Sequence, residues 1–315
     1  MDLRIIDTSN YIYIGAGILY NGIQPSISRG VKEVDGYYEA NTAPYGGVKF
    51  LIDKMIELAE IPNTIVIPVF DSAPIIKRQM YAKVFGDTHG YKGTRKKHDP
   101  NIGLQREFAK TLLTKMEFPV QCVDGYEADD IIYSLVYYYK NDFDNIYIHT
   151  LDSDLSFLVD KNVSIRGITK KNPKNIDIEN YSYSVHRTKT VGYNLISLVK
   201  LCEGDKADNI PGIGDEWGAP FDKVVSTKDL PKCGDLDFCR KALIEVVSKN
   251  PMLPNASRVL DTFDLLVPLL IPEDRLETIE LIPNKEMFVY FKKGWEAKLD
   301  TWGFEDAIIE YINEY

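Results

Sequence analysis

Two aspartates, Asp152 and Asp154, follow a β-forming run near the middle of the chain, within the stretch LDSDLSFLV. A solvated turn would account for one of these carboxylates. Two carboxylates separated by a single residue at the end of a strand can also point to one location, as ligands of a cation would. This second interpretation gains weight only if other carboxylates reach the same place.

Other expected strands also end in acids. Asp7 ends the expected strand 3–7, and Asp71 follows the apolar, β-branched run at 64–70. Ligands of an open parallel sheet bind outside the carboxyl ends of its strands. One such aspartate is most often a helix N-cap or a turn residue. Aspartates from three separate strands make that explanation less adequate.

Further acids stand at expected helix starts and turns. GYEADD places Glu127, Asp129 and Asp130 in a first helical turn, and EGDKADN supplies Asp205 and Asp208. The helix dipole accounts for acids in a first turn, but not for their coincidence with the strand-end set. So many carboxylates in one pocket would repel each other without cations. Mg²⁺ or Mn²⁺ suits such oxygen ligands, and two ions about 3.5–4 Å apart can hold a scissile phosphate and activate water.

A basic segment, YKGTRKKH at 91–98, interrupts this acidic chain. A run of this kind is usually a solvated loop, but beside a metal cluster it predicts a phosphate contact, with Tyr91 stacking on a base. The candidate DNA-binding residues here are Lys77, Arg78, Tyr91, Lys92, Arg95, Lys96 and Lys97.

The turn NIPGIG at 209–214 is rich in residues typical of tight turns. Gly212 and Gly214 would let backbone N–H groups approach a phosphate, and a following helix N-terminus would favour the anion. Such a turn is weak evidence alone and stronger directly after Asp205 and Asp208.

The elements that must position these residues alternate in the first half of the chain. Strands are expected at 3–7, 64–70, 118–123 and 145–150, and helices at 46–60, 104–116 and 127–141. Strands separated by helices predict an α/β fold with a mostly parallel sheet covered on both sides. Beyond about residue 190, helices are expected at 193–204, 237–249, 256–270 and 295–315, which predicts a second, mainly helical region.

The composition sets broad limits. The chain has 315 residues, 44% of them hydrophobic, and a net charge of −10, which argues against nucleic-acid binding except through a local basic patch. Four cysteines without zinc-type spacing favour a reduced, intracellular protein. We expect no signal peptide and no membrane span, and hence a cytoplasmic location.

The ordered motifs IIDTSN, VFDSA, YKGTR, EADD, LDSDLSFLV and GDKADNIPGIG span residues 5–214. Their set and order resemble the flap endonuclease or 5′-nuclease family in its compact phage and bacterial form. The resemblance implies a PIN-like nuclease domain at 1–190, with a helical arch near 77–106. It also implies a helix-three-turn-helix (helix-hairpin-helix-like) DNA-binding region with a helical C-terminus at 191–315.

The resemblance further implies flap endonuclease and 5′-3′ exonuclease activity on DNA with a 5′ flap or free 5′ end, or on an RNA–DNA hybrid, in replication or repair. We also expect a monomer, with replisome proteins as further partners. Lys92 and Arg95 match the basic pair that contacts the scissile phosphate. Gly212 and Gly214 match a turn that holds the duplex with K⁺. The implied ligands of two Mg²⁺ or Mn²⁺ ions, or their close support, are Asp7, Asp71, Glu127, Asp129, Asp130, Asp152, Asp154, Asp205 and Asp208.

Two alternatives stay open. A PIN-type ribonuclease would use the same acids, but would end before a duplex-binding turn such as NIPGIG. A catalytically silent DNA-binding or replisome scaffold protein would keep the fold, but has no evident reason to retain the crowded carboxylates.

Overall fold

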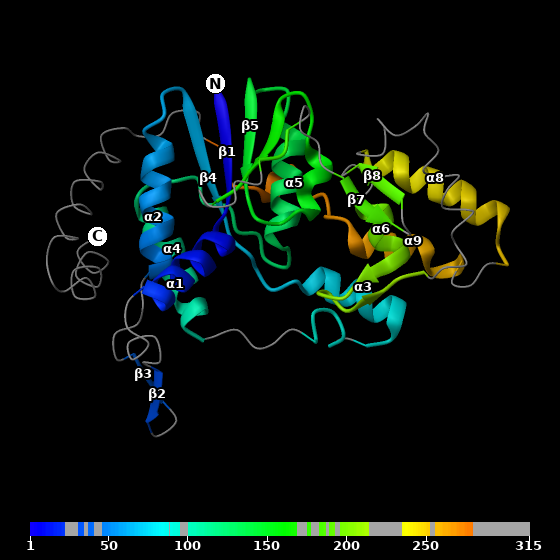
Figure 1. Ribbon diagram of the computed structural model, residues 1–315, viewed down its shortest axis with the longest axis horizontal. Coiled ribbons are helices and arrows are strands. Elements are labelled where there is room, and N and C mark those ends of the chain that lie inside the picture. The colour runs from blue at the N-terminus through cyan, green and yellow to red at the C-terminus, as the bar shows by residue number, and fades with distance from the viewer. Residues whose placement is uncertain are drawn as a thin grey trace, which may run out of the picture. The chain divides into compact units, whose positions relative to one another are not determined.

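The computed structural model, whose helices and strands are labelled in Figure 1, divides into two compact units whose segments alternate along the chain. One comprises Met1–Phe70, Lys97–Cys122 and Leu276–Tyr315, and the other comprises Asp71–Lys96 and Val123–Arg275. The structure describes residues 1–22, 31–34, 37–40, 46–87, 89–94, 100–168, 175–177, 183–186, 189–192, 196–213, 235–252 and 256–279. The first unit is called the N-terminal unit below, and the second the acidic unit.

The N-terminal unit is built on two parallel strands. Strand β1 (Asp2–Asp7) pairs with β4 (Thr64–Val69) in the register Asp2↔Thr64 to Asp7↔Val69. Helices α1 (Thr8–Gly22), α2 (Gly46–Ala59) and α4 (Pro100–Lys115) pack on one another, and α2 also contacts β4. The short strands β2 (Val31–Val34) and β3 (Tyr37–Ala40) form an antiparallel pair.

Local chemistry explains how β1 leads into α1. The strand ends at Asp7, and Thr8 at the start of α1 donates its hydroxyl to the Val69 carbonyl at 2.7 Å. The Asn10 amide donates to the Asp7 carboxylate. Asp7 is therefore buried and held at the junction of strand and helix.

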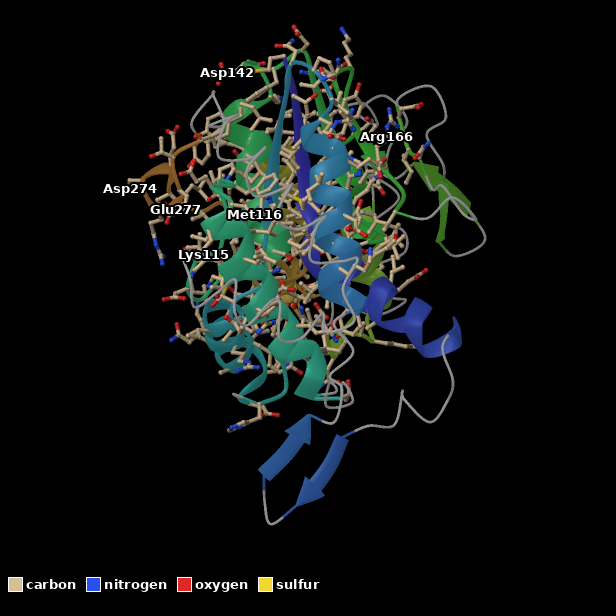
Figure 2. All side chains as sticks on the ribbon, turned by 90° about the vertical axis from the view of Figure 1, so that its left-hand side faces the viewer. Lys115, Met116, Asp142, Arg166, Asp274 and Glu277 are labelled. Atoms are coloured by element: carbon tan, nitrogen blue, oxygen red, sulfur yellow. The ribbon has the colours of Figure 1, made fainter. Side chains whose placement is uncertain are left out.

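The chain returns to the N-terminal unit after residue 275. The Gln121 side chain donates to the Glu277 carbonyl at 2.8 Å and accepts from the Glu277 N–H at 2.9 Å. Glu277 is labelled in Figure 2, as are Lys115 and Met116 at the end of α4. The fully buried Gln121 side chain thus uses both its amide nitrogen and its amide oxygen to hold the returning segment at Glu277.

The acidic unit carries the second parallel pair. Strand β5 (Asn145–His149) pairs with β6 (Val163–Arg166), with Ile146 opposite Val163. The other elements of this part are α3 (Ile75–Phe85), α5 (Ala128–Tyr139) and the 3₁₀ helix η1 (Asp154–Leu158). Helix α3 ends at Gly86, whose left-handed backbone (φ 76°) lets its N–H reach the Ala82 carbonyl.

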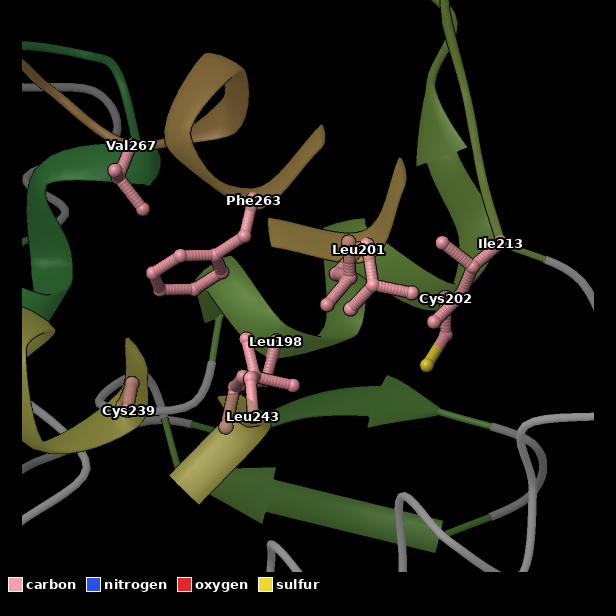
Figure 3. Packing of buried hydrophobic residues seen from close by; sticks show 9 residues of the cluster. Leu198, Leu201, Cys202, Ile213, Cys239, Leu243, Phe263 and Val267 are labelled. Atoms are coloured by element: carbon pink, nitrogen blue, oxygen red, sulfur yellow. The ribbon is translucent and has the colours of Figure 1, made fainter. Parts of the chain in front are cut away.

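Three helices enclose an apolar cluster in the acidic unit, shown in Figure 3. They are α6 (Ile196–Glu203), α8 (Leu236–Lys249) and α9 (Val259–Leu266). The 3₁₀ helix η5 (Ala256–Arg258) precedes α9, and the 3₁₀ helix η6 (Glu273–Arg275) follows it. Leu198, Leu201 and Phe263 form its centre. Two antiparallel pairs complete the unit: β7 (Tyr183–His186) with β8 (Lys189–Gly192), and β9 (Gly204–Asp205) with β10 (Ile210–Pro211).

The α/β class and the parallel strands confirm the sequence-based expectation. The expected strand 118–123 is wrong as an element, because only the isolated bridge Val69↔Gln121 forms there. The expected helix 256–270 is also too long. Helix α9 ends at Leu266, because Val267 precedes Pro268 and adopts an extended backbone.

Some expectations remain outside this description. The expected helix 295–315 falls outside the described residues. The functional division at residue 190 stays a prediction. Among the described helices, none combines the length and apolar composition needed to cross a membrane.

Candidate functional site

Five of the acids singled out from the sequence line one small pocket in the acidic unit. They are Glu127, Asp129, Asp154, Asp205 and Asp208. Two lysines, Lys77 and Lys200, line it with them, and its volume of about 30 Å³ has room for roughly two water-sized species. This pocket is called the acidic pocket below. Segments far apart in sequence therefore contribute carboxylates to one pocket, whose lining does not include Asp7, Asp71, Asp130 and Asp152.

The end of β5 delivers Asp152 and Asp154 through a short hydrogen-bonded turn. The Thr150 hydroxyl accepts the Asp152 N–H at 3.0 Å, and Asp152 Oδ1 accepts the Asp154 N–H at 2.8 Å. Helix η1 then buries Leu155 and Phe157. Because these apolar anchors fix the turn, Asp154 is held at the pocket wall.

Helix α5 begins with a reciprocal capping box between Glu127 and Asp130. Asp130 accepts the Glu127 N–H at 3.0 Å and the Leu269 N–H at 2.7 Å, and it is fully buried. Asp71 Oδ1 accepts the Ala128 N–H at 2.9 Å. Both aspartates thus meet backbone N–H groups at or beside the start of α5, which fits the role of close support around the other acids.

Three lysines pair with the acids. Lys77 Nζ lies 3.4 Å from both Glu127 Oε2 and Asp130 Oδ1. Lys92 contacts Glu127 and lies 3.9 Å from Asp208 Oδ2. Lys200 contacts both Asp154 and Asp205.

These pairs correct the expectation for Lys77. Its side chain is only 7% exposed and faces the acids, so it does not extend a DNA-facing basic surface. The neighbouring Arg78 is exposed and remains a candidate phosphate contact. Arg95, Lys96 and Lys97 lie outside the described residues.

Tyr91 also differs from its expected role. It is 2% exposed, its ring lies 6.2 Å from that of Tyr81, and its hydroxyl donates to Glu127 Oε2 at 2.7 Å. The expectation that Tyr91 stacks on a base is therefore wrong, because its ring is packed inside the acidic unit. From the sequence, Tyr91 was assigned to the basic segment because cations follow it, whereas its side chain belongs to the buried core.

The position of Gly212 has no room for a side chain, because neighbouring backbone lies too close. A Cβ there would lie 2.2 Å from the Cys202 carbonyl oxygen and 2.6 Å from the Gly204 nitrogen. Gly204 itself has a φ of +83°. The close backbone approach that Gly212 allows here is to its own chain, and the expected approach to a phosphate stays a prediction. Gly214 lies outside the described residues.

The lysines control the charge of the acids. Burial alone would raise the pKa of Glu127, but Lys77 and Lys92 outweigh it and lower that pKa from 4.5 to about 2. Burial would also raise the pKa of Asp205, but the hydrogen bond and charge of Lys200 lower it. Burial and the neighbouring Asp152 raise the pKa of Asp154. At least two carboxylates therefore stay ionised at neutral pH.

The donor set suits a hard divalent cation. Within the described ranges, no three His, Cys, Asp or Glu side chains are grouped closely enough to hold a metal ion. Ionised carboxylates are nevertheless the ligands that Mg²⁺ and Mn²⁺ prefer. The Lys200 ammonium between Asp154 and Asp205 shows that two of these carboxylates face one cation position.

Sequence reasoning missed Lys200. The signal for it was a single lysine within the mostly apolar run ISLVKLC, five residues before Asp205. Asp7 belongs to the N-terminal unit, and its participation in a site with the acids of the acidic unit stays a prediction.

The sequence matches a known protein family. The family described as "5′-3′ exonuclease, N-terminal resolvase-like domain" matches residues 3–185. The 5′-3′ exonuclease of Aquifex aeolicus is 28% identical over 212 residues, which cover 67% of this chain and 64% of that protein. DNA polymerase I of Caldicellulosiruptor bescii is 35% identical over 200 residues, or 62% of this chain. The aligned part spans only 23% of that polymerase.

Solved structures of similar proteins include the T5 D15 protein co-crystallised with metal ions. It is 14% identical, the match covers 100% of this chain and 98% of that one, and the TM-score is 0.48. The catalytic core of Rad2 in complex with a DNA substrate is 16% identical, with 92% and 86% of the two chains covered and a TM-score of 0.44.

Proposed function

Because the chain belongs to the family of 5′-3′ exonuclease N-terminal, resolvase-like domains, we propose that it is a divalent-metal-dependent 5′ nuclease acting on DNA. The observation that carries this proposal is the acidic pocket, which is lined by five carboxylates from three separate segments. Crowding of this kind is unfavourable for folding and is useful where cations are to be bound. The pocket therefore supports phosphodiester hydrolysis better than it supports a silent binding role.

The acids divide into two roles under this proposal. The candidate ligands are the pocket-lining acids Glu127, Asp129, Asp154, Asp205 and Asp208, with Asp152 and Asp7 as further candidates. Asp71 and Asp130 hold the start of α5, so they position the ligands rather than bind the ion. When bound, two Mg²⁺ or Mn²⁺ ions would supply a metal-activated water and stabilise charge on the scissile phosphate.

The chain's own cations orient these groups. Lys92 has 21% of its side chain exposed and contacts Glu127, so its ammonium lies at the rim of the acidic cluster. A phosphate drawn to that cluster would meet Lys92 at its edge, where a fixed positive charge favours the developing negative charge of the transition state. Lys92 is therefore the proposed phosphate contact among the described residues, with Arg95 as its proposed companion.

The substrate is proposed to be DNA with a 5′ flap or a free 5′ end. The polymerase relatives are named for DNA synthesis, and the Aquifex relative is named a 5′-3′ exonuclease. These names support removal of flaps or primers during replication or repair. A K⁺ ion at the glycine turn belongs to the same proposal.

Cleavage of matched substrates tests this proposal. The protein is incubated with a labelled 5′ flap, the corresponding 3′ flap and single-stranded RNA, each with Mn²⁺ or with EDTA. We expect the 5′ flap to be cut with Mn²⁺ and to stay intact with EDTA. Equal cleavage of both flaps would contradict the proposed polarity, and preferential cleavage of RNA would favour a ribonuclease.

A further inference from the structure

Lys200 occupies the space between two candidate metal ligands. Its Nζ donates to Asp205 Oδ2 at 2.5 Å and also to Asp154 Oδ2. Lys200 is only 21% exposed, and Asp205 only 11%. The ammonium is thus a partly buried cation shared by two carboxylates that come from distant parts of the sequence.

The fold holds Lys200 in this position from both sides. Its helix α6 is anchored by Leu198 and Leu201 in the apolar cluster of Figure 3. Asp205 uses its other oxygen, Oδ1, to accept the N–H groups of Ala207 at 2.8 Å and Asp208 at 3.1 Å. The aspartate is therefore oriented by the β9–β10 turn, and its Oδ2 is directed toward the cation.

Electrostatics explains why a cation is needed there. Asp154 and Asp205 both accept hydrogen bonds from the Lys200 ammonium, and their negative charges favour its protonated form. The ammonium consequently stays charged at neutral pH. Without it, two carboxylates in one pocket would repel each other at close range.

We propose that Lys200 is a built-in counter-ion that holds the acidic pocket together, and that a divalent ion binding Asp154 and Asp205 displaces its ammonium. This inference rests on the metal dependence proposed above. Mg²⁺ requires carboxylate oxygens at about 2.0–2.1 Å, and the same oxygens now face Nζ. Both cations cannot occupy one position, so metal binding and the lysine contact exclude each other.

The first test compares three variants with the wild type by titration calorimetry with Mn²⁺ and by thermal unfolding in EDTA. Lys200→Met removes the charge, Lys200→Arg keeps it, and Lys206→Met removes an exposed charge close by in sequence.

We expect Lys200→Met to melt roughly 2–4 °C lower in EDTA, the shift that about 1 kcal/mol causes in a domain of 150–250 residues. We also expect it to bind Mn²⁺ roughly tenfold more tightly than the wild type, because no ammonium competes. The other two variants should resemble the wild type more closely in both measurements.

The second test needs no variant and so does not depend on folding of a mutant. Lysines of the wild-type protein are acetylated briefly with and without Mn²⁺, and the label on each is read by mass spectrometry. We expect labelling of Lys200 to increase with Mn²⁺, while that of Lys206 stays constant.

The outcomes separate the two proposals. Equal or weaker Mn²⁺ binding by Lys200→Met, or labelling of Lys200 that does not increase with Mn²⁺ in a protein that binds it, would overturn the role of Lys200 alone. Failure of both the wild type and Lys200→Met to bind Mn²⁺ would overturn the proposed metal dependence and this inference with it.

Discussion

The hydroxyl of Tyr91 donates a hydrogen bond to Glu127 Oε2 at 2.7 Å and lies 3.2 Å from Asp208 Oδ2. Tyr91, the first residue of the basic segment, thereby contacts two candidate metal ligands. Backbone contacts strengthen the junction, because the Lys92 N–H donates to the Asp208 carbonyl at 3.0 Å and Asn209 donates its side-chain amide to the Gly90 carbonyl at 3.0 Å.

Two residues at this junction have a left-handed backbone, with φ values of 57° for Lys92 and 60° for Asn209. Such conformations are uncommon for residues other than glycine and often mark functional sites. Here they bring the basic segment and the 208–209 turn into contact, so that both are held against the acidic pocket.

Removing the Tyr91 hydroxyl tests this junction. Tyr91→Phe keeps the ring packing but loses the hydrogen bond to Glu127, so metal affinity or cleavage should fall roughly tenfold to 100-fold. Tyr138→Phe is the matched control, because it loses a comparable bond to the Ile271 carbonyl (3.0 Å) away from the pocket. Each change should lower the unfolding free energy by about 1 kcal/mol. Equal cleavage by both variants would show that the hydroxyl of Tyr91 has only a structural role.

The lowered pKa of Glu127 predicts how stability depends on pH. Because Glu127 has a folded pKa of about 2 and an ordinary value of 4.5, its ionisation stabilises the protein above pH 4.5. That contribution is lost as the pH falls from 4.5 toward 2. The difference in unfolding free energy between wild type and Glu127→Gln should therefore be largest near pH 7 and shrink over this acid range. Urea unfolding at a series of pH values measures it, and a difference that does not change with pH would refute the role of Lys77 and Lys92 in holding Glu127 ionised.

Gly212 provides a test of the turn between Asp205 and Asp208. Gly212→Ala places a Cβ 2.2 Å from the Cys202 carbonyl oxygen, so the variant should lose roughly 1–3 kcal/mol of unfolding free energy. Gly103→Ala in α4 is the control, because a Cβ there has no neighbour within 4 Å, and it should keep or raise stability. The midpoint of unfolding should therefore be clearly lower for Gly212→Ala than for Gly103→Ala. Normal stability of Gly212→Ala with weakened DNA binding would instead support a direct phosphate contact at this glycine.

The sequence predicted the elements whose periodicity is strong. Helices α2, α5, α6 and α8 and strands β1, β4 and β5 lie close to their expected ranges. Helix α1 was missed, because its residues TSNYIYIGAG mix β-branched, aromatic and glycine residues that do not favour a helix locally. Its formation depends on packing against α2 and α4, which no local pattern reveals.

The candidate site was predictable in its acids but not in its cations. Of the strand-end aspartates, Asp154 lines the acidic pocket, and the acidic motifs GYEADD and EGDKADN supply its other four acids. The pattern YKGTR suggested an exposed segment, yet Tyr91 is buried and Lys92 pairs with Glu127. The run ISLVKLC singles out Lys200, but its partner Asp154 is distant in sequence, so their pairing depends on tertiary structure.

Single-turnover cleavage by Asp154→Asn tests the central claim most directly. The variant removes one carboxylate charge from the acidic pocket, whereas Asp142→Asn removes an exposed one at the end of α5, labelled in Figure 2. With a 5′-flap substrate in Mn²⁺, cleavage by Asp154→Asn should fall roughly 100-fold or more, while DNA binding in Ca²⁺ and cleavage by Asp142→Asn stay near those of the wild type. Cleavage by Asp154→Asn at the wild-type rate would contradict the assignment of the acidic pocket as the catalytic metal site.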